Sequence, residues 1–345
     1  MTASRHARVS ILFTAAGLLL AAACGTDEGG AHEGAGGRER RVTVSAWDTT
    51  WTVGGSAGDS LLLNPFLIAA GDSAVYVFDG GASRLLAFEA DRGGLRWKAG
   101  RGGGGPLEFR RVRDLKLAAD GSPVLLDIGN RRLTRVSPTG VLAGETSLPA
   151  IGYADQMALL ADGRTVLLTD HPDSAFAVVD GRGRLVERFA HPWSGFAALH
   201  PLVRQGSLAS SPDGAWAFGF SLGSGWMAFR GSRGVGALKP YVERAEFPEV
   251  VEKAEGNAVT TQLASYAPCS ACSVTMDGAD FYAHFGGVTP RRRRLLDRYD
   301  RQTGEYRESY LLPVEATAVS VAGGTVYALI EEPYPTLLAL RPRRD

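Results

Sequence analysis

The sequence predicts an all-β fold assembled from one repeated unit, and three observations support this. Glycine is abundant, with 44 of 345 residues, and the glycines recur at turn positions along the chain instead of gathering in one tract. Two-residue Asp-Gly or Gly-Gly turns also recur, and both of their central positions favour positive φ, as hairpin turns require. Short apolar runs of strand length flank these turns on both sides.

The turns mark six units, and neighbouring turns are 42 to 64 residues apart. The six turns are Gly71-Asp72, Asp120-Gly121, Asp162-Gly163, Asp213-Gly214, Asp277-Gly278 and Gly323-Gly324. One strand precedes each turn, a second follows it, and a third and usually a fourth come after. Units of four antiparallel strands and roughly 40–50 residues are typical of propeller blades. The sequence therefore predicts a six-bladed β-propeller with four-stranded antiparallel blades.

The last unit lacks its outermost strand, because the chain reaches Leu340 with only three strands in that unit. The segment Arg41 to Gly55 has strand character and belongs to no other unit. We expect this N-terminal strand to complete the sixth blade. The ring would then be closed without an exposed sheet edge.

The N-terminus carries a predicted export signal. Arg5 and Arg8 precede the apolar run Val9 to Ala23, which is too short for a membrane-spanning helix. The run stops at Cys24, and "LAAAC" resembles the lipobox of bacterial lipoproteins, whose cysteine is lipidated after cleavage. Simple secretion is the alternative. We assign residues 1–23 to a signal peptide, 24–40 to lipidated Cys24 and a flexible tether, and 41–345 to the propeller.

The resemblance also implies a location. Gly25 follows the cysteine, and it is not the aspartate that retains such lipoproteins at the inner membrane. The expected location is therefore the bacterial cell envelope, on the periplasmic face of the outer membrane.

A glycine-rich stretch, Gly100 to Phe109, carries a second resemblance. This "GRGGGGPLEF" and the following "LAADGSPVLLDIGNRRLTRVSPTG" resemble the six-bladed NHL-type β-propellers, particularly bacterial lipoproteins of that group. The resemblance is close over the second unit, fair over the first and third, and loose over the others. It implies the fold, whereas the group is too heterogeneous for an activity to follow.

The same stretch contains G-x-G-x-x-G, the pattern of a dinucleotide-binding loop. Such a loop must open a helix, whose N-terminus holds the phosphates. Here Pro106 and "FRRVRDLKLAA" lead into another strand. We therefore interpret the stretch as a connector between blades.

Two classes of function remain open. Lys+Arg and Asp+Glu number 37 each, which excludes the basic footprint of a nucleic-acid-binding protein. No catalytic motif is recognisable, so we expect a monomeric, non-enzymatic module, without cofactor or metal, that binds an envelope protein or a small polar ligand. The alternative is a metal-dependent enzyme of the calcium lactonase or lyase type. The inner strands carry Arg113 and Lys116 beside Asp114, Asp155 and Gln156, which disfavours calcium, and stoichiometric bound calcium would favour the enzyme.

One mouth of the central channel is the expected binding face. In this topology the connectors into the inner strands share a face with the loops between second and third strands. Its polar residues include Arg110, Arg111 and Asp155. We select six residues that begin successive inner strands and combine aromatic, donor and cationic groups: Arg113, Tyr153, Gln156, His200, Arg204 and Tyr266. The alternative interpretation is that these are ordinary solvated loop residues or form hydrogen bonds between blades.

The segment around blade five carries three smaller predictions. Cys269 and Cys272 predict a disulfide, which must lie in a turn because residues three apart in a strand are too far separated. The run Phe247 to Gly256, with Pro248 near its start and a glycine at its end, predicts a short helix. The run Arg291 to Arg294 is either an anionic docking site or a solvated rim.

Overall fold

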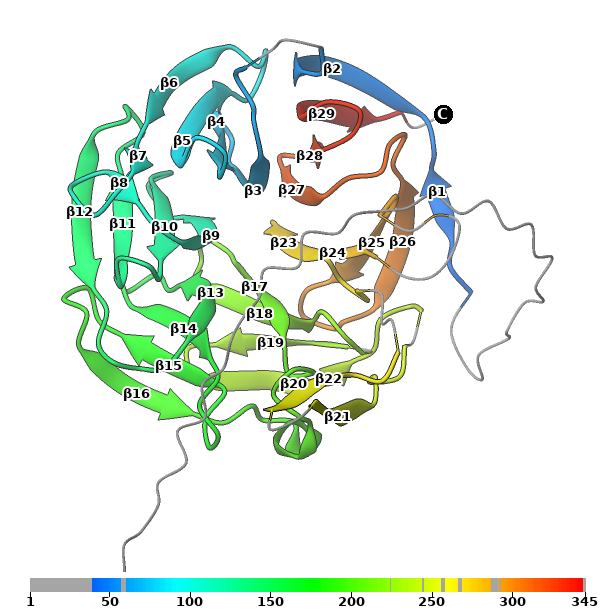
Figure 1. Ribbon diagram of the computed structural model, residues 1–345. Coiled ribbons are helices and arrows are strands. Elements are labelled where there is room, and N and C mark those ends of the chain that lie inside the picture. The colour runs from blue at the N-terminus through cyan, green and yellow to red at the C-terminus, as the bar shows by residue number, and fades with distance from the viewer. Residues whose placement is uncertain are drawn as a thin grey trace, which may run out of the picture. The chain divides into compact units, whose positions relative to one another are not determined.

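The computed structural model describes residues 39–343, apart from 57–59, 224, 244, 256–257, 266–268, 287–290 and 292. The chain divides into two units, Met1–Ala35 and Gly36–Asp345, and every described residue belongs to the second. In this unit six antiparallel sheets form a ring, each with its first strand nearest the common axis (Figure 1). The all-β, six-bladed propeller with four-stranded blades is thus confirmed. Cys24 and the predicted signal peptide lie outside the described residues.

Blades one to three follow one another in chain order. Blade one consists of β3 (Pro65–Ala70), β4 (Ala74–Asp79), β5 (Arg84–Glu89) and β6 (Leu95–Ala99). Blade two consists of β9 (Val112–Leu117), β10 (Pro123–Asp127), β11 (Arg132–Val136) and β12 (Leu142–Ser147). Blade three consists of β13 (Ala154–Leu159), β14 (Thr165–Thr169), β15 (Phe176–Val179) and β16 (Leu185–Phe189). The connector between blades one and two holds the short strands β7 (Arg101–Gly102) and β8 (Glu108–Phe109).

The second half of the ring follows the same plan, with added N-terminal strands. Blade four consists of β17 (Gly206–Ser210), β18 (Ala215–Phe220), β19 (Trp226–Arg230) and β20 (Arg233–Lys239). Blade five consists of β23 (Ser273–Asp277), β24 (Asp280–Phe285), β25 (Leu295–Asp300), β26 (Tyr306–Leu311) and, at its edge, β1 (Val42–Val44). Blade six consists of β27 (Ala318–Ala322), β28 (Thr325–Ile330), β29 (Thr336–Pro342) and β2 (Trp47–Gly54).

The apolar runs of the sequence form the middle strands of the blades. Strands β4, β10 and β24 are buried at every position. A middle strand is covered on both faces by the neighbouring blades, so both of its faces are apolar and the alternation of a half-exposed strand disappears. The outermost strands β6 and β12 remain largely exposed.

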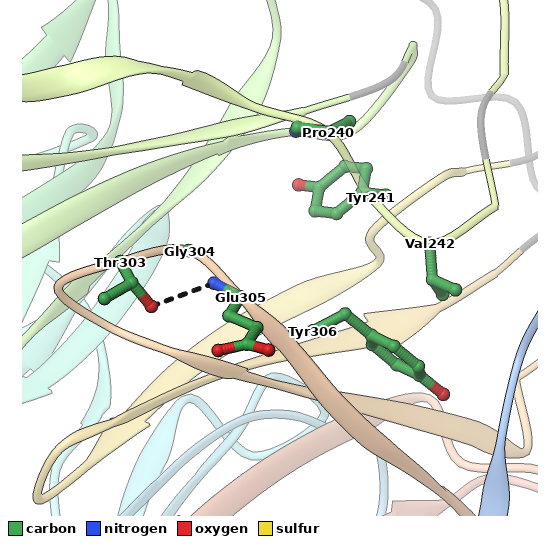
Figure 2. Close-up of a pocket in the computed structure, with 7 residues that line it drawn as sticks. All are labelled: Pro240, Tyr241, Val242, Thr303, Gly304, Glu305 and Tyr306. Carbon is green, nitrogen blue, oxygen red and sulfur yellow. Dashed lines mark hydrogen bonds between the residues drawn. The ribbon is translucent and has the colours of Figure 1, made fainter. Parts of the chain in front are cut away.

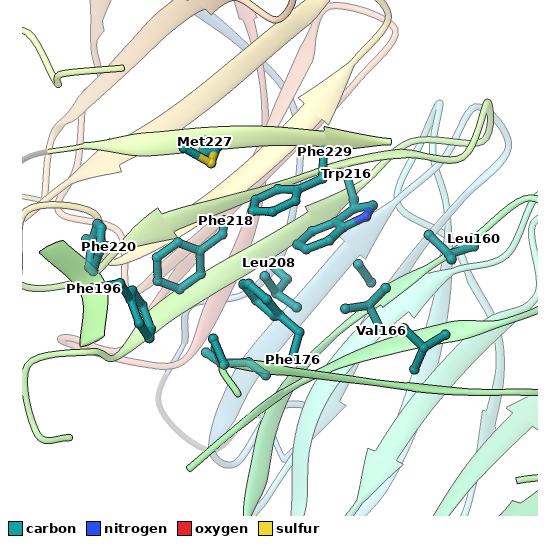
Figure 3. Packing of buried hydrophobic residues seen from close by; sticks show 14 residues of the cluster. Leu160, Val166, Phe176, Phe196, Leu208, Trp216, Phe218, Phe220, Met227 and Phe229 are labelled. Atoms are coloured by element: carbon teal, nitrogen blue, oxygen red, sulfur yellow. The ribbon is translucent and has the colours of Figure 1, made fainter. Parts of the chain in front are cut away.

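Six hydrophobic clusters hold the ring together, one between each pair of neighbouring blades. The cluster between blades three and four is rich in aromatic rings (Figure 3). In it Trp216 stacks on Phe229 with centroids 4.0 Å apart, and Phe176 meets Trp216 edge-on at 5.2 Å. Because each cluster draws on two blades, no blade has a core of its own.

Tryptophans of two outermost strands cover glycine turns of the next blade. Trp97 of β6 lies over Gly140 and donates its indole N–H to a carbonyl of blade two at 2.8 Å. Trp51 of β2 lies over Gly93 in the same way and donates to Ala90 at 3.0 Å. Both glycines have positive φ, and a side chain on either would collide with the indole. The N-terminal strand is therefore packed against blade one as well as blade six.

The N-terminal segment pairs with two blades. Strand β1 lies parallel to β26 of blade five, with Val42 opposite Ser309. Strand β2 then runs antiparallel to β29 along its length, from Trp47 opposite Pro342 to Gly54 opposite Thr336. The pairing with blade five was not anticipated from the sequence. That the ring depends on β2 for its closure stays a prediction.

Arg40 fixes the point at which this segment meets the ring. Its guanidinium donates to both oxygens of Asp297, at 3.1 and 2.8 Å, and lies 4.2 Å from the centre of the Phe285 ring. Asp297 is buried, so the arginine supplies the charge that this carboxylate requires. Arg40 is thus packed against blade five.

The predicted helix after Phe247 is wrong. The described part of that run forms β21 (Val250–Glu255), which pairs in register with β22 (Ala258–Leu263) as a separate hairpin. Its β-branched valines and threonines favour extended backbone more than a nearby proline favours a helix start. Phe247 precedes the hairpin and stacks on Trp193, with centroids 5.8 Å apart.

Candidate functional site

Carboxylates hold the incoming connectors of blades one to three against the loops that follow their second strands; Asp79 and Asp127 are buried, whereas Asp170 is exposed. Asp79 accepts the backbone N–H groups of Leu63 and Asn64 at 3.0 and 2.9 Å. Asp127 accepts those of the connector into blade two, and Asp170 accepts that of Tyr153 at 3.0 Å. These bonds confirm that connectors and loops share one face of the ring, which we name the mouth face.

A bulge marks the mouth end of the inner strand in each of these three blades. In blade two, the consecutive residues Leu126 and Asp127 of β10 pair with Asp114 and Val112, so Arg113 is an extra residue. The same register shift sets Phe66 apart in blade one and Asp155 in blade three. Bulges re-aim side chains and recur beside binding sites. Phe66, Arg113 and Asp155 thus form what we name the bulge arc, on three adjacent inner strands.

No register shift interrupts the pairing of the first two strands in blades four, five and six. The bulge arc is therefore confined to one half of the mouth face. It distinguishes the two halves of an otherwise repeated architecture.

Arg113 of the bulge arc and its neighbour Arg111 form no ion pair with a carboxylate among the described residues. Arg111 and Arg113 are exposed, and within the described part of the chain neither forms an ion pair. Nearby cations differ in this respect: Arg101, Lys116 and Arg132 are each paired with a carboxylate. A group of unpaired guanidiniums attracts anions.

Tyr153 lies between blades two and three, beside both arginines. Its ring centre is 5.6 Å from the guanidinium carbon of Arg111 and 6.0 Å from that of Arg113. Both distances are within the range of cation–π attraction. Both guanidiniums thus lie beside the same half-buried ring.

Asp155, the third member of the bulge arc, is acidic. Burial is the largest cause that raises the pKa of Asp155, to about 6; Arg113 opposes this shift, and the carboxylates of Asp114 and Asp170 add to it. Asp114 itself is committed elsewhere, because it bonds Lys116 at 2.7 Å and the backbone N–H of Met157 at 2.8 Å. Asp155 is thus a carboxylate whose charge is incompletely compensated.

Apolar side chains occupy the mouth face on the other side of the arginines. Leu63 and Phe66 of the connector into blade one are 49% and 38% exposed, and Tyr334, in the loop before β29 of blade six, is 42% exposed. Phe66 meets the buried Phe78 edge-on at 5.7 Å, which fixes its ring. The arc therefore runs from apolar through cationic to acidic.

Of the six residues selected from the sequence, the structure brings two together, Arg113 and Tyr153. Gln156 instead accepts the backbone N–H of Leu208 at 3.2 Å and so links two inner strands. His200 accepts the N–H of Leu202 at 3.2 Å within its own turn.

The last two selected residues are placed elsewhere. The guanidinium of Arg204 donates to the carbonyls of Leu199 and Ala197, at 2.7 and 2.6 Å, and lies 5.6 Å from the ring of Phe196. It braces the short 3-10 helix η1 (Ser194–Ala198). Tyr266 lies outside the described residues.

The sequence reasoning missed Phe66 and did not select Asp155. Period-two alternation assigns strand faces, whereas a bulge shifts the alternation by one residue. An apolar residue such as Phe66, next to a proline at the start of a strand, reads as core. Only the unequal pairing of the two strands identifies these positions.

The glycine-rich stretch is a connector, as its context predicted. Its carbonyl groups are held by blade two: Asn130 donates to Gly103 at 2.9 Å and Arg132 to Gly105 at 2.7 Å. A phosphate site would instead present free N–H groups at a helix start. Strand β9 follows directly.

The predicted disulfide between Cys269 and Cys272 is present, with Cα atoms 5.4 Å apart. It precedes β23, which begins at Ser273, and so lies in a turn as expected. The pair lies against Gly286, where any side chain would collide with the sulfur atoms. The disulfide thus packs on a loop of blade five.

Two arginines of the run 291–294, which follows the second strand of blade five, form hydrogen bonds within the protein. Arg294 donates to the carbonyl of Leu312 at 3.0 Å, and the carbonyl of Arg293 bonds the buried ring of His284 at 3.0 Å. Arg292 lies outside the described residues. The side chain of Arg294 therefore braces the connector into blade six.

A pocket of about 400 Å³ lies between Pro240–Val242 and the turn Thr303–Tyr306 (Figure 2). The hydroxyl of Tyr241 donates to Phe220 at 3.2 Å, and that of Tyr306 bonds Ser309 at 2.7 Å. Both polar tips are thus used within the protein. The turn joins β25 and β26, the third and fourth strands of blade five, so the pocket is far from the inner strands that carry the bulge arc.

The described residues contain neither a candidate metal-binding cluster nor a membrane-spanning helix. No group of three or more His, Cys, Asp or Glu side chains is placed to hold a metal ion. No helix in the same part of the chain is long and apolar enough to cross a membrane.

Comparison with known proteins identifies the fold. No family model matches the chain, and no curated protein matches its sequence. A catalytically inactive virginiamycin B lyase from Staphylococcus aureus, solved with quinupristin, is 12% identical with a TM-score of 0.52 over 85% of this chain and 99% of that one. A putative exported protein from Bacteroides fragilis is 11% identical, with a TM-score of 0.52 over 88% and 99%. Hydrazine synthase from Kuenenia stuttgartiensis is 12% identical, with a TM-score of 0.51 over 84% and 99%. At these identities the likeness shows the fold alone.

Proposed function

We propose that the protein is a monomeric, lipid-anchored binding module of the cell envelope that holds a polar or charged ligand on its mouth face. The bulge arc is the observation that carries the proposal. Three adjacent blades each carry one bulged residue at the mouth end of the inner strand, and the pairing of the first two strands in the other three blades has no such shift. Packing does not require this, because blades four to six form the same sheets without it. We infer that the bulges serve recognition.

The cationic part of the arc supports binding of an acidic group. The backbone of both arginines is fixed by the fold, because the N–H of Arg111 donates to Asp127 at 3.0 Å and Arg113 is the bulged residue of β9. Preorganised cations lose little freedom when they bind an anion.

Site-specific photocrosslinking in the native envelope tests the mouth face as the binding surface. A photoreactive residue in place of Phe66 should give a discrete adduct, and one in place of Val141, which is 63% exposed on the outer rim, should not. Arg113→Ala should reduce the adduct, and higher salt should weaken it, because exposed charges are screened over roughly 8–10 Å. Equal crosslinking from both positions would contradict the proposal.

The anchor rests on the sequence alone. Cys24 follows an apolar run of signal-peptide length, and a disulfide between Cys269 and Cys272 suits an oxidising compartment. Cys24→Ala should release the protein from the membrane fraction and abolish lipid labelling. Unchanged partitioning of this variant would show that Cys24 is not the anchor.

A further inference from the structure

We propose that the bulge arc recognises a small zwitterion of the α-amino-acid type that carries an apolar side group. Its acidic group would lie on Arg113 and Arg111, its ammonium group on Asp155, and its apolar group toward Phe66. This inference rests on the proposed function, because it names the ligand class of the same site.

The anionic half of the ligand follows from the two arginines. Both are exposed and, among the described residues, without an ion pair, and both lie within 6.0 Å of the Tyr153 ring centre. Paired guanidiniums suit a carboxylate, which accepts two N–H groups in one plane.

The cationic half of the ligand follows from Asp155. Asp114 and Asp170 face it with like charge, and Arg113 is the opposing cation. On its other side lies β17, Gly206–Ser210, which contains no titratable residue. Both neighbouring carboxylates already accept hydrogen bonds from the backbone. A ligand ammonium group would supply the missing charge, and the raised pKa of Asp155, about 6, agrees with that deficit.

A ligand with only an acidic group fits the arc less well. Its negative charge would lie beside Asp155, and like charges held together in a partly buried site repel each other. A ligand with only an amine would meet the same repulsion from Arg113. A zwitterion satisfies both ends at once. Leu63 and Phe66 continue the arc with exposed apolar surface, which favours a ligand with an apolar side group.

Three matched probes test this inference by calorimetry on the full-length protein in detergent: L-phenylalanine, 3-phenylpropanoate, which lacks the amine, and 2-phenylethylamine, which lacks the carboxylate. At pH 7.5 L-phenylalanine should bind about tenfold more tightly than either, a difference of about 1.4 kcal/mol. Asp155→Asn should remove its advantage over 3-phenylpropanoate. Arg113→Gln should remove its advantage over 2-phenylethylamine.

Controls separate charge from structure. Asp173→Asn removes an exposed carboxylate from the neighbouring loop and should leave the order of affinities unchanged. In the unaltered protein the affinity for L-phenylalanine should rise as the pH increases through about 6, because Asp155 ionises there; in Asp155→Asn this rise should vanish. Unfolding temperatures confirm that each variant folds.

Three outcomes would overturn the inference. One is that 3-phenylpropanoate binds as tightly as L-phenylalanine, and another is that Asp155→Asn leaves the order of affinities unchanged. The third is that no probe binds while the crosslink from position 66 still forms; the mouth face would then be a binding surface for another class of ligand. Loss of the crosslink as well would remove the proposed function itself.

Discussion

Blades one to three and blades four to six build the same sheets and differ in what holds their mouth loops. In the first half carboxylate side chains do so: buried Asp79, buried Asp127 and exposed Asp170 each accept at least one connector N–H group. In blade four the equivalent residue is Ser221, which uses its backbone, donating to Gln205 at 3.0 Å and accepting from Ser270 at 2.7 Å. The propeller architecture therefore does not by itself determine whether a carboxylate or the backbone holds the mouth loop.

The difference separates two tasks. The first half combines carboxylate anchors with the bulge arc, so its mouth face is chemically varied. The second half contains the disulfide, the hairpin of β21 and β22, and the two N-terminal strands. We infer that blades one to three present the site and that blades five and six join the ends of the chain. The predictions below test this division, in order of decreasing effect on stability.

Removing residues 41–55 should have the largest effect. The deletion removes β1 and β2 and leaves β29 and β26 with unpaired edges, so the protein should aggregate or lose cooperative unfolding. Thermal unfolding followed by circular dichroism, with light scattering, measures both. Removing residues 26–38 is the matched control and should cost little, because this tether has no large aliphatic residue to bury. Equal tolerance of both deletions would refute closure by the N-terminal strand.

Asp127→Ala should destabilise the first half by about 3–5 kcal/mol, because it leaves several buried N–H groups without an acceptor. Asp127 is fully buried and accepts from Arg111, Gly129 and Asn130. Ser221→Ala at the equivalent place in blade four should change stability by less than about 0.5 kcal/mol. Denaturant unfolding gives both values. Similar costs would abolish the distinction between the halves.

His191 lies at the boundary between the halves and should make stability fall in acid. Its ring stacks on Phe196 at 4.6 Å, and burial lowers the pKa of His191 to about 4 from its ordinary 6.5. The unfolded chain therefore binds a proton first as the pH falls from 6.5 to 4, and unfolding becomes easier by roughly 3 kcal/mol.

His191→Asn keeps an acceptor for the N–H of Trp193 and should remove this loss. The measurement is the unfolding free energy between pH 4 and 7. Buried His284, whose pKa is also lowered to about 4, should retain its own part of the slope. An unchanged slope in His191→Asn would show that His191 does not stay neutral in the fold.

Arg113→Ala should have the smallest effect on stability, within about 0.5 kcal/mol, because its exposed guanidinium forms no ion pair within the described chain. Arg204→Ala should cost more, about 1–3 kcal/mol, because its guanidinium donates to two carbonyls near η1. Ligand binding should show the opposite order, because Arg113→Ala should weaken it more than Arg204→Ala. A larger stability loss for Arg113→Ala would make it a structural residue.

The repeat made most of the fold predictable. Turns such as Asp120-Gly121 and runs such as that of β10 follow from local chemistry, so six blades could be counted without a structure. The parallel pairing of β1 and the ion pair of Arg40 with Asp297 could not, because residues far apart in sequence leave no local pattern. The hairpin after Phe247 was mistaken for a helix because end signals were weighed above β-branched content.

The candidate site was predictable only in part. The connector topology led to Arg113 and Tyr153, which do lie together. Nothing local distinguishes Gln156, which links two strands, from Asp155 beside it, because the bulge decides which of them is set apart. Arg204 has a suitable side chain and position, and its role became clear only from the carbonyls that it meets.

The pairing of β2 with β29 also determines when one step of folding can take place during synthesis. Asp48 and Arg343, which form an ion pair, are 295 positions apart, so β2 finds its partner only when β29 has been made. Contacts of such separation are slow to form, since the intervening chain must first be organised. Every nascent or truncated chain therefore carries an unsatisfied strand at its beginning, available to chaperones or proteases. Strand β2 is therefore paired only after β29 has been made.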